Sequence, residues 1–159
     1  MSVLLDYTSP SIDGSRAAKE DGKTMVQSTV TYQGDLHCAA QHGPSGGTLD
    51  TDAPVDNNGR GQSFSPTDLV ATALGSCMLT IMGIVASSLD VDLKGAVASV
   101  DKNMVADPQR RIGQLAVKIK VPGDVSPENR KTLEEAAHTC PVAKSIHPDI
   151  DVPVLFEWG

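Results

Sequence analysis

SPTDLVATALGSCMLTIMGIVASSL, residues 65–89, is the stretch of this chain that decides the fold. It begins with a helix start: Ser65 can cap, Pro66 suits the first helical position, and Asp68 is an acid three residues after the cap. The 21 residues that follow, 69–89, carry no charge. The stretch therefore predicts one long helix that has no charged side to present to water.

An uncharged run of this length is also what a membrane-spanning helix requires. Several features favour a helix buried in protein instead. The run contains serine, threonine and glycine, and acids flank it at Asp68, Asp90 and Asp92. It has neither the aromatic belt nor the basic anchors that are typical of a membrane span. We therefore expect a protein that does not enter a membrane, with a small membrane protein as the weaker alternative.

The predicted helix is too long for one small domain to cover. It would span about 30 Å at 1.5 Å per residue. The chain offers only two Tyr, two Phe and one Trp to pack around it. A second subunit is the natural cover, so we expect an interlocked homodimer. Gly75 and Gly83 would let another backbone approach the helix closely.

The chain on either side of the helix predicts an α+β domain of antiparallel sheets around it. Residues 1–24 are expected to form an N-terminal arm that is mobile or packs on a neighbour, and residues 25–159 to form the domain. Alternating patterns and turn residues predict the other elements: a strand meander over 25–52, a loop over 53–65, long strands near 93–106 and 110–121, a helix over 126–139, a short helix over 140–146 and a closing strand over 152–158.

Composition excludes several classes of protein. The chain has 159 residues and a formal charge of −7, which argues against binding to nucleic acid or to an anionic membrane surface. Three cysteines are too few, and an odd number, for a secreted disulfide framework, and no secretory signal is visible. The cysteines and histidines lack familiar zinc-ligand spacings, so no metal or other cofactor is expected. A cytoplasmic location is expected.

The cysteines are the candidates for chemistry. Cys77 lies inside the uncharged helix, where a thiol is either a small apolar filler or a nucleophile. Cys140 precedes Pro141 and is expected to cap the short helix, where free N–H groups and the helix dipole favour a thiolate. His138 and Lys144 could add positive charge there. Cys38, on a predicted strand, is most simply a core residue.

Two motifs and the order of elements resemble the OsmC/Ohr family of thiol peroxidases over roughly residues 25–158. The motifs are SPTDL leading to ALGSC at residues 65–77, and CPV at residues 140–142. The resemblance implies an interlocked dimer with two active sites at the interface. It also implies that Cys77 attacks an organic hydroperoxide, with hydrogen peroxide as a further candidate substrate, and becomes a sulfenic acid. Cys140 would then resolve it as a disulfide, which an external dithiol reduces.

The family's activating pair is altered here. In its peroxidases an acid follows the proline directly and, with an arginine, orients the nucleophile. This chain has Thr67 at that position and the acid one residue later, at Asp68. Arg60 is the first candidate for the arginine and Arg16 the second. The alternative function is a non-catalytic OsmC-like dimer that binds a small apolar ligand between its long helices.

Overall fold

The computed structural model describes residues 19–20 and 23–159, which fall into two units, one up to Phe64 and one from Ser65 to the C-terminus. Each unit is considered by itself. Most of the expected N-terminal arm, including Arg16, lies outside the described residues.

The first unit is a strand meander, as predicted. The ribbon β1 (Lys19–Glu20) and β2 (Lys23–Thr24) precedes an antiparallel sheet whose order is β3-β4-β5. Its strands are β3 (Ser28–Gly34), β4 (His37–His42) and β5 (Thr48–Asp52), followed by the short 3-10 helix η1 (Val55–Asn57). The register places one set of apolar side chains on a common face of the sheet: Val30, Tyr32, Cys38, Ala40 and Leu49.

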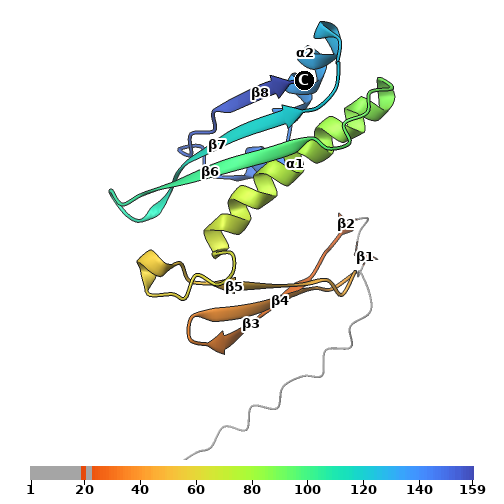
Figure 1. Cartoon of the computed structure of the whole chain (residues 1–159). Helices are drawn as coiled ribbons and strands as arrows, with labels where there is room; N and C mark the ends of the chain where they lie inside the picture. Colours follow the sequence, from red (N-terminus) through yellow and green to blue (C-terminus); the bar gives the residue numbers. More distant parts are fainter. Residues whose placement is uncertain (1–18, 21–22) are drawn as a thin grey trace, which may run out of the picture. The chain divides into compact units, whose positions relative to one another are not determined.

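The second unit contains the long helix and a second three-stranded sheet, in the order β6-β7-β8 (Figure 1). The elements lie within a few residues of their predicted positions: α1 (Pro66–Ser88), β6 (Val97–Val105), β7 (Arg111–Val121), α2 (Pro127–Ala137), α3 (Pro141–Ser145) and β8 (Val154–Trp158). β6 and β7 are antiparallel, but β8 runs parallel to β7. This differs from the wholly antiparallel expectation, because the α2–α3 connection returns the chain to the start of β7.

The core of this unit lies between α1 and the inner face of the sheet. The buried side chains come from α1, β7 and α2: Ala71, Leu74, Met78, Met82, Ala86, Ile112, Leu115, Val117, Ile119, Val121, Leu133 and Ala137. Gly75 is buried against β6, and a Cβ there would lie 3.0 Å from Val100 Cγ2. The sequence suggested that Gly75 makes room for a second subunit. In the structure Gly75 instead makes room for a strand of the same chain.

The opposite face of α1 is open in the single chain. Its exposed residues are uncharged and mostly small: Thr72, Ala73, Ser76, Thr80, Ile84, Ser87 and Ser88. Ile84 is 65% exposed. By length and composition α1 could cross a membrane, with a mean hydropathy of 2.1 over an 18-residue window. A core helix has the same composition, and here α1 packs one face on β6 and β7.

Candidate active site

Two of the three thiols come together in the second unit. Cys77 lies midway along α1, and Cys140 occupies the N-cap of α3. The two thiols are neighbours, close enough for Cys77 to raise the pKa of Cys140. Cys140 is 0% exposed, whereas Cys77 is half-buried at the edge of the core. The structure therefore brings together the two cysteines that the motifs singled out, one of them buried and the other partly open.

The end of α2 sets the position of Cys140. The Cys140 N–H donates to the carbonyl of Ala137, at 3.2 Å, which closes the last turn after α2. Pro141 then starts α3 at once, and the Cys140 carbonyl accepts from Lys144 N–H at 3.2 Å. Since Leu133 and Ala137 are fully buried beneath this corner, the thiol is held in the core rather than at the surface.

The helix N-cap does not make Cys140 a thiolate, which corrects the expectation from sequence. Burial raises the pKa of the Cys140 thiol, and the adjacent Cys77 raises it further. The backbone N–H groups of Ala143 and Val142 at the start of α3 act the other way but are outweighed. A protonated Cys140 can donate its S–H to the Cys77 sulfur and is itself a poor nucleophile.

The expected positive neighbours of Cys140 are engaged elsewhere or open to water. The ring of His138 packs edge-on against Phe156, with centroids 6.2 Å apart. Lys144 is exposed. Cys38, the third thiol, is half-buried on the apolar face of the meander and lies opposite Tyr32 in the register.

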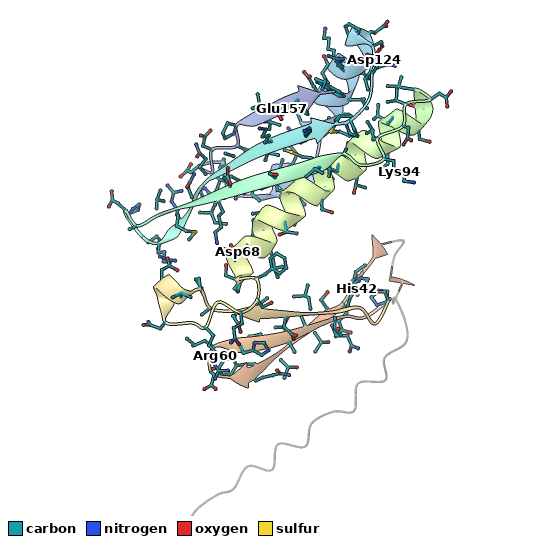
Figure 2. The ribbon with its side chains drawn as sticks, in the orientation of Figure 1. His42, Arg60, Asp68, Lys94, Asp124 and Glu157 are labelled. Carbon is teal, nitrogen blue, oxygen red and sulfur yellow. The ribbon has the colours of Figure 1, made fainter. Side chains whose placement is uncertain are left out.

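Asp68 caps α1, as its spacing predicted, and it also holds a lysine. Its carboxylate accepts from the Ser65 N–H while Ser65 Oγ accepts from the Asp68 N–H, which is a complete capping box. Lys102 Nζ lies 2.5 Å from Asp68 Oδ1 and 2.8 Å from Thr67 Oγ1. Burial alone would raise the pKa of Asp68, but the hydrogen bonds from Lys102 and Ser65 lower it overall. Figure 2 labels Asp68 at the start of the helix.

Lys102 was missed from sequence, although a signal was present. It lies on β6 in phase with the residues that face α1, which are Ala98, Val100 and Met104. Within β6, all of whose residues are described, it is the one charged side chain on that face. A lysine in an apolar phase of an alternating strand indicates a charged or polar partner nearby, and Asp68 is that partner.

The structure describes Arg60 within its own unit. Its guanidinium lies 2.5 Å from Asp35 in an exposed ion pair, and Figure 2 labels it there. The loop that carries Arg60 is held by the buried carboxylate of Asp52. This carboxylate accepts from the Gln62 N–H at 2.9 Å and lies 2.6 Å from the His37 ring. A role for Arg60 at Cys77 stays a prediction. Thr67 bonds to Lys102 and Ser65 rather than supplying a charge.

Comparison with known proteins places the chain in a family. The family model described as OsmC-like protein matches residues 59–154. A candidate osmotic stress induced and detoxification response protein from Psychrobacter arcticus is 49% identical, with a TM-score of 0.80 over 85% of this chain and 98% of that one.

More distant structures share the fold. An organic hydroperoxide resistance protein from Elizabethkingia anophelis is 16% identical, with a TM-score of 0.70 over 88% of this chain and 100% of that one. A Legionella pneumophila organic hydroperoxide resistance protein is 18% identical, with a TM-score of 0.65 over 84% and 96%. No curated protein sequence matches the chain. On the family model and the 49% identity, the chain belongs to the OsmC/Ohr family.

Proposed function

We propose that this protein is a cysteine-based peroxidase that reduces organic hydroperoxides, with hydrogen peroxide as a further substrate. The observation that carries the proposal is the adjacent pair of thiols of Cys77 and Cys140, one half-buried and the other fully buried. Such a pair has a reachable thiol to meet an oxidant and a protected thiol to trap the product. The names of two structural relatives, both organic hydroperoxide resistance proteins, agree with it.

The proposed reaction balances with these two thiols and an external dithiol. The Cys77 thiolate attacks one peroxide oxygen and the O–O bond breaks, so that Cys77 becomes a sulfenic acid and an alcohol leaves with a proton. Cys140 then attacks the Cys77 sulfur, a disulfide forms and water leaves. A dithiol reduces the disulfide and is itself oxidised. In a reducing compartment such as the cytoplasm, both cysteines would be returned to the thiol form.

The open face of α1 supports a homodimer. Beyond its first turn, α1 leaves exposed a long side without charge, made of small neutral residues around the 65% exposed Ile84. The outer face of the β6-β7-β8 sheet carries charged side chains, including Lys118, Lys120 and Glu157, so it is the poorer candidate for an interface. We therefore propose that a second copy covers the open side of α1. Sedimentation at micromolar concentration should give twice the monomer mass, and a stable monomer would contradict this.

The test of the activity is peroxide consumption by the reduced protein, followed by peptide mass spectrometry. We expect cumene hydroperoxide to produce a disulfide between Cys77 and Cys140 with the loss of two hydrogens. Cys38→Ser is the matched control, because it removes a thiol outside the pair and should leave consumption unchanged. Oxidation of Cys38 with the other two thiols left free would contradict the proposal.

A non-catalytic dimer that binds an apolar ligand is the second candidate. Thr67 stands where the family's peroxidases have an acid, and within its own unit Arg60 is paired with Asp35. Thiols that stay reduced in excess hydroperoxide, in a folded dimer, would favour this function over the peroxidase.

A further inference from the structure

We propose that Cys140 acts once before it forms the disulfide: its S–H donates a proton to the oxygen that leaves when Cys77 cleaves the hydroperoxide. This inference rests on the proposed function, because it concerns the first step of the same cycle. It makes Cys140 the general acid of the peroxide-cleaving step as well as the thiol that later traps the sulfenic acid.

The leaving group of an organic hydroperoxide is the reason that this step needs an acid. When a thiolate takes the terminal oxygen, the O–O bond breaks and the other oxygen departs as an alkoxide. An alkoxide is a base about as strong as hydroxide, whose conjugate acid, water, has a pKa of about 15.7. It therefore leaves slowly unless a proton reaches it as the bond breaks. A positioned proton donor contributes about 10²–10⁴-fold to the rate of such a step.

Cys140 is the neighbour of the attacking sulfur. The two thiols are close enough to influence each other, and Cys77 packs against the buried cluster to which Cys140 belongs. The leaving oxygen is one bond away from the oxygen that Cys77 attacks, so a group beside the Cys77 sulfur lies near both oxygens. An S–H rotates about its C–S bond, as a hydroxyl does about its C–O bond, and can turn from the Cys77 sulfur toward the leaving oxygen.

Cys140 also keeps the proton that it would donate. Its side chain makes no capping hydrogen bond at the start of α3, and its sulfur is fully buried. Burial raises the pKa of the thiol, so the proton is still present when a hydroperoxide arrives. An alkoxide is nevertheless a much stronger base than this thiolate. Transfer of the proton from Cys140 to the leaving oxygen is therefore favourable.

Other polar groups near Cys77 are less suited to this task. Within one turn of Cys77 on α1 the hydroxyls belong to Ser76 and Thr80. Thr80 Oγ1 already donates to the Ser76 carbonyl at 2.8 Å, and Ser76 itself lies about 100° around the helix from Cys77. Beside Cys140, the His138 ring packs on an aromatic ring of β8, and Lys144 is exposed. Among these described groups, the Cys140 thiol is the donor that is both adjacent and free to donate.

The step balances with the groups named. The Cys77 thiolate forms an S–O bond with the terminal oxygen, the O–O bond breaks, and its electron pair goes to the leaving oxygen. That oxygen takes the proton from Cys140 and departs in an alcohol, which leaves Cys77 as a sulfenic acid and Cys140 as a thiolate. Because burial favours the neutral thiol, Cys140 then takes a proton back from water before the slower disulfide step.

Two oxidants with different leaving groups test the assignment. Cumene hydroperoxide releases a strongly basic alkoxide, whereas peroxybenzoic acid releases benzoate, a weak base that leaves without a proton. Each is mixed with one equivalent of reduced protein at a slightly acidic pH, which keeps the peroxyacid protonated, and the loss of oxidant is followed by stopped flow. The measured quantity is the ratio of the two rate constants within each protein, because this ratio cancels any change in the amount of Cys77 thiolate.

Variants at Cys140 remove or keep the donor. Cys140→Ala removes it and Cys140→Ser keeps one, and since both lack the second thiol they form a matched pair. We expect the ratio of the cumene hydroperoxide rate to the peroxybenzoic acid rate to fall about a hundredfold in Cys140→Ala, and by much less in Cys140→Ser. Cys140→Val is a second variant without a donor, for use if the smaller alanine loosens the corner between α2 and α3.

An unchanged ratio in the variants without a donor would overturn the inference, even if both oxidants reacted more slowly, because Cys140 would then act only through Cys77. A wild-type protein that consumes neither oxidant would refute the proposed function and the inference with it. The wild-type rates therefore distinguish failure of the proposed function from failure of the inference alone.

Discussion

Replacing Lys102 by methionine should destabilise the protein measurably, because Lys102 holds the start of α1 against β6. Its side chain is only 16% exposed, and its ammonium contacts Asp68, Thr67 and Ser65 Oγ, the last at 3.3 Å. Methionine preserves the length and the apolar stem but removes the charge and every donated hydrogen bond. Asp68 then keeps only its bonds to Ser65.

The expected loss follows from the exposure of the two partners. A hydrogen bond to a charged group contributes about 1.5–3 kcal/mol when it is protected from water. Asp68 is 41% exposed, so water recovers part of that after the substitution. We expect a loss of about 1–2 kcal/mol, which corresponds to about 3–6 °C in Tm for a chain of this size.

The stability lost in Lys102→Met should depend on pH, because Lys102 lowers the pKa of Asp68. The folded-state pKa of Asp68 is lowered below its ordinary value of 3.8. A lowered carboxyl pKa stabilises the fold above the unfolded value, and this stability disappears as the pH falls through the folded value. The stability gap between the wild type and Lys102→Met should therefore be full at pH 6 and shrink below about pH 4.

Urea unfolding at one fixed protein concentration measures this gap at each pH, since a dimer's stability depends on concentration. Lys118→Met is the matched control on the neighbouring strand. Lys118 lies 2.7 Å from Glu157 with both side chains about half exposed, so the substitution should cost less than about 1 kcal/mol. A Lys102→Met protein as stable as the wild type, or a gap that stays constant down to pH 3, would refute the reasoning.

Three further predictions concern the thiols. Cys77→Ser should abolish peroxide turnover, whereas Cys140→Ser should still allow one oxidation to a sulfenic acid that dimedone traps; the reverse pattern would exchange the two roles. In the wild-type protein, disulfide formation from the Cys77 sulfenic acid should speed up as the pH rises above neutral in stopped-flow mixing, because burial and Cys77 raise the pKa of Cys140, and a flat profile would contradict this. Arg60→Ala should slow peroxide consumption. Asp35→Ala, which removes the partner of Arg60 but keeps the arginine's charge, should not slow it. If both variants consumed peroxide at the same rate, Arg60 would be no more than a surface charge.

Much of the fold was predictable because local rules and tertiary packing agree in this chain. The capping box at Ser65 and Asp68 and the alternation of β7 fixed the start of α1 and the inner face of the sheet. The parallel pairing of β8 with β7 was not predictable in this way, since alternation shows which residues share a face but not the direction of the neighbouring strand.

The candidate site was predictable to a lesser degree. Sequence motifs paired Cys77 with Cys140, but the charge state of Cys140 depends on burial, which the Cys-Pro motif does not reveal. Lys102 could have been found from its phase on β6, yet its partner could not, because Asp68 lies 34 positions away and meets it only in the folded unit. Long-range contacts of charged groups are decided by packing, which local patterns do not encode.

Burial of Cys140 has two opposite effects on the proposed cycle. It keeps Cys140 protonated, so this thiol waits for the Cys77 sulfenic acid rather than competing for peroxide. It also slows the step in which Cys140 must attack, because that step needs the thiolate. During this delay a half-buried sulfenic acid is open to a second peroxide, which would carry it to the sulfinic acid. The protection that selects Cys77 as the attacking thiol therefore also makes Cys77 the sulfur at risk of over-oxidation when hydroperoxide is abundant.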